Sequence, residues 1–190
     1  MRIESAWQGP FAWPKTNSAL PSAPSIPGVY LWAFEYADGF LPYAAGITRR
    51  TVATRLQEHT QGYLSGVYTI LDVDALQRGV RRELWHGFWM RPRSAERTTE
   101  YETRRLELEE AARRQLSSFR IFVASVGIAP RILERLEAAI MQHLYAQPKP
   151  LCDLPDTGMM LAPRHAAEEA IEVVLPCQHK LYGLPVEIVI

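Results

Sequence analysis

Arg55 and His59 lie four residues apart in the stretch RLQEH. In an α-helix this spacing places both side chains on one face. The helix would begin soon after an apolar segment that contains Gly46, so it would follow a strand directly. Such a face could bind an anion through the arginine and exchange a proton through the histidine. Considered alone, however, the pair is more typical of a solvated helix face.

The composition is that of an ordinary globular protein, with 190 residues of which 47% are hydrophobic and 22% charged. This length predicts a single domain with a substantial core. No apolar run approaches the roughly 20 residues of a membrane-spanning helix, so we expect no membrane segment. The first residues lack the apolar core of a secretory signal, and the only cysteines are Cys152 and Cys177. Both features favour the cytoplasm.

The 21 basic and 21 acidic residues give no net charge. This balance argues against a protein that coats nucleic acid non-specifically, because such proteins usually carry a basic excess. It does not exclude an enzyme with a local basic groove.

The pattern of apolar residues and turn signals predicts a hairpin followed by a helix. Two strands rich in aromatic and β-branched residues flank an Ala-Asp-Gly turn, and Thr51 can cap the helix that follows. A third strand and an amphipathic helix come later in the chain. These elements are expected at residues 28–36, 40–47, 51–62, 119–127 and 130–146.

The other segments are less regular. We expect an irregular N-terminal arm that packs on the domain through Trp7, Phe11 and Trp13, and a long charged helix that begins at Ser94. We also expect three strands, at 81–90, 171–176 and 185–190, and a short helix near 163–172.

The order of these elements and four short segments resemble the GIY-YIG nuclease family. The segments are GVY at 28–30, PYAAGIT at 42–48, RLQEH at 55–59 and RLEAAIMQHL at 135–144. The resemblance implies an α+β fold with a small three-stranded antiparallel sheet flanked by helices. Residues 1–190 would form one domain, with a core at 27–65 and 118–153, an irregular arm at 1–26, a helical insertion at 66–117 and a C-terminal β-rich addition at 154–190.

The family resemblance also implies roles for individual residues. Glu137 would bind Mg²⁺ or Mn²⁺, which suits a metal that often takes only one or two carboxylates together with waters. Arg55 would bind the phosphate with its planar guanidinium. Tyr30 and His59 would move the proton of the attacking water, with Tyr43 as a further candidate.

Each of these residues also has a purely structural interpretation. Tyr30 lies in an aromatic strand, where a tyrosine is more often part of the core. His59 could favour the dipole near a helix end, and Glu137 could pair with Arg131 or Arg135. Glu137 nevertheless borders the apolar stripe of its helix, which favours a functional role.

The second motif departs from the family pattern. The family carries a tyrosine two residues before the glycine, whereas Ala44 stands there and Tyr43 stands three residues before Gly46. An offset of one residue turns a side chain to the opposite face of a strand, unless a bulge restores it. Asp153 also stands near the place of a family asparagine. These departures bear on catalysis more than on the fold.

The function expected from the resemblance is metal-dependent hydrolysis of phosphodiester bonds in double-stranded DNA. One alternative is a catalytically impaired member of the same fold that binds nucleic acid or a protein. Another is an unrelated α+β protein with a structural or regulatory role.

Overall fold

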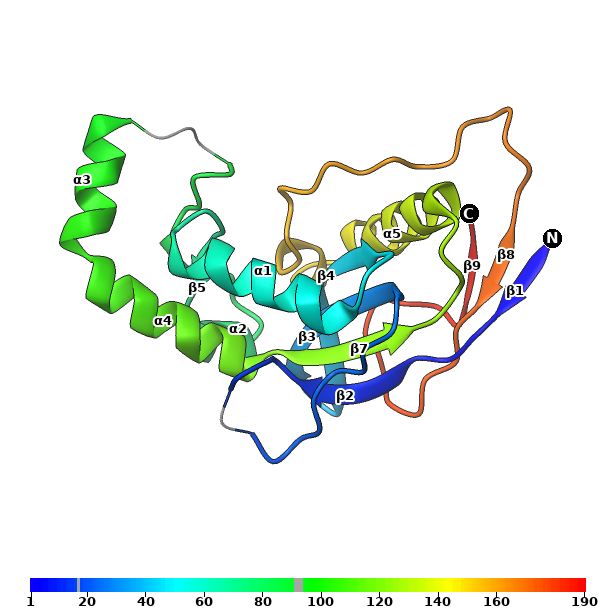
Figure 1. The fold of residues 1–190 in the computed structure, drawn as a ribbon, viewed down its shortest axis with the longest axis horizontal. Helices are drawn as coiled ribbons and strands as arrows, with labels where there is room; N and C mark the ends of the chain where they lie inside the picture. The colour runs from blue at the N-terminus through cyan, green and yellow to red at the C-terminus, as the bar shows by residue number, and fades with distance from the viewer. Residues whose placement is uncertain (17, 91–93) are drawn as a thin grey trace.

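The computed structural model describes residues 1–16, 18–90 and 94–190 (Figure 1). In chain order the elements are β1 (Arg2–Glu4), β2 (Gln8–Ala12), β3 (Gly28–Tyr36), β4 (Gly39–Thr48), α1 (Val52–Leu64), β5 (Ile70–Leu71), α2 (Val73–Gln77), β6 (Glu83–Trp85), α3 (Ala95–Thr103), α4 (Arg105–Ser118), β7 (Arg120–Ala124), α5 (Pro130–Tyr145), the 3-10 helix η1 (Leu151–Asp153), β8 (Glu172–Val174) and β9 (Glu187–Val189). The predicted α+β class is confirmed.

The central sheet is antiparallel and has the strand order β2-β7-β3-β4. Its three predicted strands are β3, β4 and β7, and the fourth comes from the N-terminal arm, which was expected to be irregular. Strand β2 contains Gly9 and Pro10, two residues that weaken the sequence signal of a strand. It covers the edge of β7 that would otherwise expose unpaired backbone groups.

Helix α1 begins where the sequence predicted. Thr51 is its N-cap, with a side-chain oxygen that accepts a hydrogen bond from the backbone N–H of Thr54 at 3.1 Å. The short loop after β4 therefore fixes the direction of α1 relative to the hairpin, and with it the side chains on the helix.

The charged segment that begins at Ser94 forms two helices instead of the single one expected. The chain turns at Arg104, which separates α3 from α4. Because of this turn, Tyr101 of α3 is buried and its hydroxyl donates to the carbonyl of Leu64 at 2.8 Å. Figure 1 shows α3 at the end of the molecule opposite both termini.

The strand expected at 81–90 is shorter, since only β6 is extended.

The C-terminal segment supplies both strands that its sequence predicted. Strands β8 and β9 join β1 in a second sheet with the order β1-β8-β9. The prediction of a helix near 163–172 is wrong, because this segment forms a turn. Glu168 accepts hydrogen bonds from the His165 N–H and from Arg131, and both hold the turn in place.

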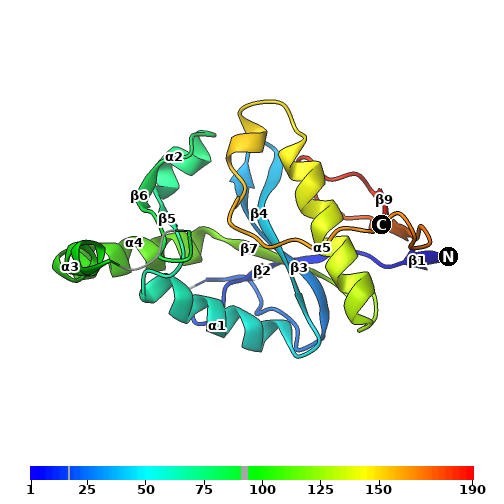
Figure 2. The same cartoon turned by 90° about the horizontal axis from the view of Figure 1, so that it is seen from above.

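The core lies between the central sheet and the helices around it (Figure 2). Helix α5 packs along β4, while α1 packs against α4. The apolar stripe predicted for α5 is confirmed, since its members are completely or almost completely buried: Leu133, Leu136, Ile140 and Leu144. Trp7 and Trp13 of the N-terminal arm are also buried, as expected. No helix within the described residues combines the length and apolar character that crossing a membrane requires.

Candidate active site

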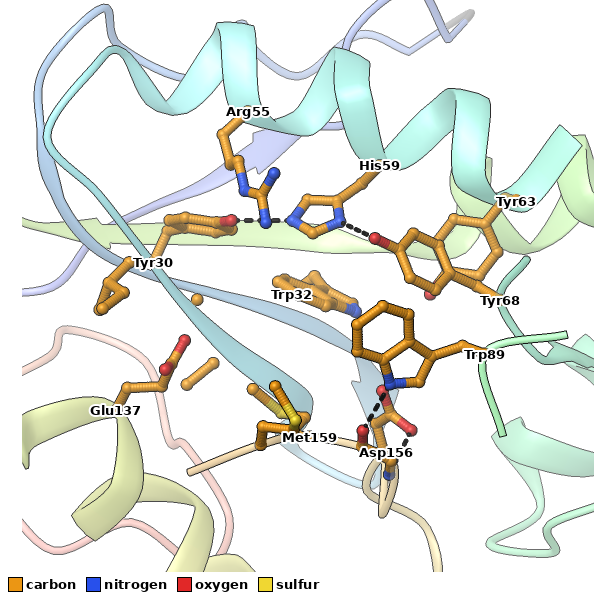
Figure 3. A pocket seen from close by; sticks show the side chains of 15 residues that line it. Tyr30, Trp32, Arg55, His59, Tyr63, Tyr68, Trp89, Glu137, Asp156 and Met159 are labelled. Carbon is orange, nitrogen blue, oxygen red and sulfur yellow. Dashed lines mark hydrogen bonds between the residues drawn. The ribbon is translucent and has the colours of Figure 1, made fainter. Parts of the chain in front are cut away.

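A cavity of about 310 Å³ lies between the β3–β4 hairpin, α1, α5 and the segment 156–160. Tyr30 contributes to its floor, Arg55 and His59 line it from α1, and Glu137 lines it from α5 (Figure 3). Four of the five candidate residues therefore meet in one cavity, although they come from three separate elements. Tyr43 is not among the residues that line it.

His59 connects two tyrosines across the cavity. The Tyr30 hydroxyl lies 2.9 Å from His59 Nε2, and the Tyr68 hydroxyl lies 3.3 Å from Nδ1 (Figure 3). A neutral imidazole donates a hydrogen bond from one nitrogen and accepts one at the other. The three side chains therefore form a continuous hydrogen-bonded path through the imidazole.

The environment of His59 favours the neutral form. Burial lowers the pKa of His59 to about 4, and the positive charge of Arg55 acts in the same direction, whereas Glu58 opposes it. Burial also raises the pKa of the Tyr30 hydroxyl, while the charge of Arg55 partly counteracts this effect. At neutral pH the pair thus consists of an uncharged imidazole and a protonated phenol.

Gly46 makes room for the Tyr30 ring. The two residues are paired across β3 and β4, and Tyr30 is only 1% exposed. A Cβ atom at residue 46 would lie 2.5 Å from Cζ and 2.6 Å from the hydroxyl of Tyr30. The glycine of the second motif therefore has a packing role that sets the position of this hydroxyl.

Arg55 belongs both to the cavity and to a surface ion pair. Its guanidinium lies 2.9 Å from the Glu58 carboxylate, which also forms an ion pair with Arg50 at 2.7 Å. The two arginines hold the pKa of Glu58 at about 2. The local pairing expected of a solvated helix face is thus present, but it coexists with the cavity position of Arg55.

Glu137 is a partly buried carboxyl group that no cationic side chain contacts directly within the described residues. Within the described part of the chain, its side chain has neither an ion pair nor a hydrogen bond, and burial raises its pKa to about 7 against the opposing charge of Arg55. A divalent cation would supply the missing positive charge. One carboxylate, together with waters and a substrate phosphate, is a sufficient donor set for Mg²⁺. Among the described residues, those around Glu137 included, no cluster of three or more His, Cys, Asp or Glu side chains could hold a metal ion.

Tyr43 lies at a β-bulge and belongs to the core. Trp32 pairs with Ala44 and Ala33 pairs with Pro42, so that Tyr43 has no partner on β3. The bulge does not return the ring to the cavity, because Tyr43 is buried with its centroid 5.5 Å from that of Phe119. The structure therefore separates Tyr43 from the other four candidates.

Asp153 also lies away from these residues. Its side chain is half exposed and lies 3.5 Å from Lys149, outside the cavity lining. Tyr43 and Asp153 are the residues nearest in sequence to the two positions that differ from the family pattern. Neither of them lines the cavity, so neither replaces the missing family residue.

Several residues of the cavity were not among those predicted from the sequence. Trp32 and Tyr68 extend the aromatic floor, whereas Trp89, Asp156 and Met159 form the opposite end (Figure 3). The alternation of β3 could have identified Trp32, which lies two residues after Tyr30 on the same face. The others lie in loops, where no periodicity indicates the direction of a side chain.

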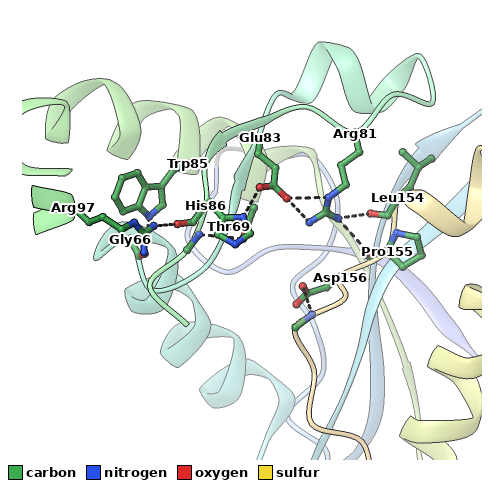
Figure 4. Close-up of polar contacts among 12 residues, drawn as sticks. Gly66, Thr69, Arg81, Glu83, Trp85, His86, Arg97, Leu154, Pro155 and Asp156 are labelled. Atoms are coloured by element: carbon green, nitrogen blue, oxygen red, sulfur yellow. Dashed lines mark hydrogen bonds and ion pairs between the residues drawn. The ribbon is translucent and has the colours of Figure 1, made fainter. Parts of the chain in front are cut away.

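Arg81 holds the loop that carries Asp156. Its guanidinium donates to the carbonyl oxygens of Leu154 and Pro155 at 3.1 and 3.0 Å, and it pairs with Glu83 at 3.0 Å (Figure 4). Burial raises the pKa of the Asp156 carboxyl. Arg81 thus fixes residues 154 and 155 next to Asp156, which lines the cavity.

Comparison of the chain with protein-family models, curated proteins and solved structures gave no match.

Proposed function

We propose that this protein is a metal-dependent endonuclease of the GIY-YIG type that hydrolyses phosphodiester bonds in double-stranded DNA. The observation that carries the proposal is the meeting of Tyr30, Arg55, His59 and Glu137 in one cavity. Four short segments had suggested these residues before their positions were known. A shared cavity is the arrangement that the reaction requires, and it supports the proposal.

Arg55 has the chemistry to bind the scissile phosphate. Its planar guanidinium can form two parallel, charge-assisted hydrogen bonds with phosphate oxygens. A donor that is already positioned in the cavity stabilises charge that develops on the phosphate. The Glu58 carboxylate, 2.9 Å away, keeps the guanidinium oriented before the substrate arrives.

The Tyr30–His59 pair supplies a route for a proton. The phenol accepts the proton of the attacking water only if its own proton leaves, and the neutral imidazole at 2.9 Å can accept it. Tyr68 at the other ring nitrogen holds the imidazole in place. Such positioning contributes to rate because the reacting groups need no reorganisation.

Glu137 would hold a Mg²⁺ or Mn²⁺ ion at the same end of the cavity. A divalent ion bound there supplies Lewis acidity and neutralises the charge of the phosphate. A cation bound there would favour the ionised form of Glu137, which burial disfavours. We further propose that the protein acts in the cytoplasm.

The test is incubation of the protein with supercoiled plasmid in the presence of Mg²⁺, Mn²⁺ or EDTA. We expect nicked or linear DNA with either metal and intact DNA with EDTA. Glu137→Gln should abolish cleavage, whereas Glu134→Gln changes a carboxylate of the same helix outside the cavity and should retain it. Intact plasmid under all metal conditions would contradict the proposal.

A second candidate is a catalytically impaired module that binds nucleic acid or a protein. The observation that favours it is the position of Tyr43, which leaves Ala44 at the place of the family's second tyrosine. This candidate predicts binding of DNA or a protein partner without cleavage at any metal concentration.

A further inference from the structure

The cavity has two chemically different ends. One end carries Arg55 and Glu137, whereas the other carries the indole of Trp89 beside Asp156 and Met159 (Figure 3). The side chain of Trp89 is 57% exposed even though it borders the cavity. An exposed tryptophan at the edge of a polar cavity offers a flat surface to a ligand.

The Trp89 ring is held in this position by the loop that contains Gly158. Its Nε1 donates to the carbonyl oxygen of Gly158 at 2.9 Å. A Cβ atom at Gly158 would lie 2.4 Å from the sulfur of Met90 and 3.5 Å from Cδ1 of Trp89, so a larger residue there would require the flexible Met90 side chain to move. The indole is therefore pre-positioned rather than free to rotate into solvent.

Asp156 points a carboxylate toward the same space. Its Oδ1 accepts a hydrogen bond from the Gly158 N–H at 3.2 Å, and its backbone N–H donates to the carbonyl of Tyr43 at 2.8 Å. In Figure 3 the carboxylate lies next to the Trp89 indole. An aromatic face and a hydrogen-bond acceptor thus stand together in one end of the cavity.

We propose that this end of the cavity binds one base, flipped out of the duplex, of the nucleic acid strand whose phosphate lies at Arg55. The inference rests on the proposed function and specifies how the same site engages its substrate. The base stacks on Trp89, and its exocyclic amino group donates to Asp156. Cytosine, adenine and guanine each carry such a group, whereas thymine has none.

The two ends match the two parts of a nucleotide. A phosphate is anionic and suits the arginine, while a base is planar, apolar on its faces and polar on its edge. Stacking of a base on an aromatic side chain contributes about 1–3 kcal/mol, and it is tolerant of base identity. Selectivity among the bases therefore depends on the hydrogen bond between the edge of the base and Asp156. The cavity of about 310 Å³ lies at the lower end of the roughly 300–1,000 Å³ typical of small-molecule sites.

The test measures binding separately from cleavage. Fluorescein-labelled hexanucleotides, oligo(dC) and oligo(dT), are titrated with the wild-type protein in EDTA and followed by fluorescence anisotropy. We expect oligo(dC) to bind about 10-fold to 150-fold more tightly than oligo(dT), the range of one hydrogen bond to a charged group. Asp156→Asn keeps an oxygen for the Gly158 N–H but replaces the other acceptor by a donor, and should remove this preference.

Variants of Trp89 test the stacking contact. Trp89→Ala should weaken binding of both oligonucleotides by about 5-fold to 100-fold. Trp89→Phe retains a ring but loses the bond to Gly158, so its loss should be smaller. Leu106→Ala removes an exposed apolar side chain of α4 outside the cavity and is the matched control. Circular dichroism and thermal unfolding verify that each variant is folded.

The outcomes separate the two proposals. Failure of the wild-type protein to bind either oligonucleotide, or equal binding by folded Trp89→Ala and Leu106→Ala, would overturn the base site. Equal affinity of the wild-type protein for oligo(dC) and oligo(dT) would overturn the role of Asp156. If the wild-type protein shows the expected binding pattern but never cleaves plasmid with Mg²⁺ or Mn²⁺, the base site stands and the endonuclease proposal fails.

Discussion

The hydroxyl of Tyr30 lies 2.9 Å from Nε2 of His59, and this contact joins the first strand of the central hairpin to helix α1 across 29 residues of sequence. Both side chains are buried or nearly so, and neither is charged at neutral pH. The contact therefore depends on the local packing rather than on an ion pair. It has consequences for catalysis, for pH dependence and for the choice of residue at Gly46.

Removal of the Tyr30 hydroxyl should affect cleavage much more than removal of the Tyr43 hydroxyl. Tyr30→Phe keeps the packing of the ring but breaks the contact with His59, and we expect a decrease in nicking rate of about 100-fold or more. Tyr43→Phe should leave the rate within about 3-fold of wild type, because this ring lies in the core. The measurement is the initial rate of plasmid nicking. A larger decrease for Tyr43→Phe would mean that the bulge directs this tyrosine into the site during the reaction.

Arg55 and Arg50 form a matched pair for mutation, since both contact Glu58 but only Arg55 lines the cavity. Arg55→Ala should lower the nicking rate about 100-fold or more, the usual effect of removing a donor that stabilises transition-state charge. Arg50→Ala should change it by less than about 3-fold at moderate salt. Equal decreases for both variants would show that general electrostatic attraction of DNA, and not the cavity position, explains the role of Arg55.

Glu137 should make stability fall as the pH rises through neutrality. Its pKa is raised from 4.5 in the unfolded chain to about 7 in the folded protein, so the folded state binds more protons between these values. The resulting stabilisation is complete below pH 4.5 and is lost as the pH rises through 7. Relative to Glu137→Gln, the wild-type protein should lose at most about 3 kcal/mol over this window. Urea unfolding of both proteins at pH 4.5 and 8 measures the difference. A constant difference would show that Glu137 is not desolvated.

His59 should make the stability of the folded protein rise with pH over a similar range. Its pKa is lowered from 6.5 in the unfolded chain to about 4 in the folded protein, so stability is complete above pH 6.5 and is lost as the pH falls through 4. NMR of histidine-labelled protein should therefore show the His59 ring titrating near pH 4, with His59→Gln used to assign its signal. Titration of this ring near pH 6.5 would mean that His59 is open to solvent.

Gly46→Ala should displace the Tyr30 ring, because the new Cβ would lie 2.5 Å from its Cζ atom. We expect a loss of about 1–3 kcal/mol in stability, typical of overpacking, together with a decrease in the nicking rate. If the second effect acts through Tyr30, it should not add to that of Tyr30→Phe in the double variant. Additive decreases would show that Gly46 acts independently of the tyrosine.

The sequence predicted the elements that have an uninterrupted pattern. Strand β3 has the predicted bounds, because a continuous run of aromatic and β-branched residues lies between a proline and an Ala-Asp-Gly turn. Helix α5 begins at the predicted Pro130, and its apolar period is that of a half-buried helix. Strand β2 was missed because Gly9 and Pro10 interrupt its pattern, and only the edge of β7 gives it a partner.

The same reasoning explains which parts of the candidate site could be predicted. Arg55, His59 and Glu137 lie on regular helices, where spacing determines the face of each side chain. Trp89 and Asp156 lie in loops whose course depends on tertiary contacts, such as the hydrogen bonds from Arg81 to Leu154 and Pro155. Sequence periodicity contains no information about such contacts. The bulge at Tyr43 could not be predicted for the same reason, since it is defined only by the pairing of β4 with β3.

The pairing of β1 with β8 separates the order of synthesis from the order of assembly. Arg2 lies opposite Glu172, so the first strand of the chain has no partner until the ribosome has added about 170 further residues. Strand β2 likewise requires β7 before it can join the central sheet. Closure of such long loops has an entropic cost and slows folding. We therefore expect the β3–β4 hairpin and α1 to form before the N-terminal strands find their places, so that the candidate site begins to take shape before the sheet around it is complete.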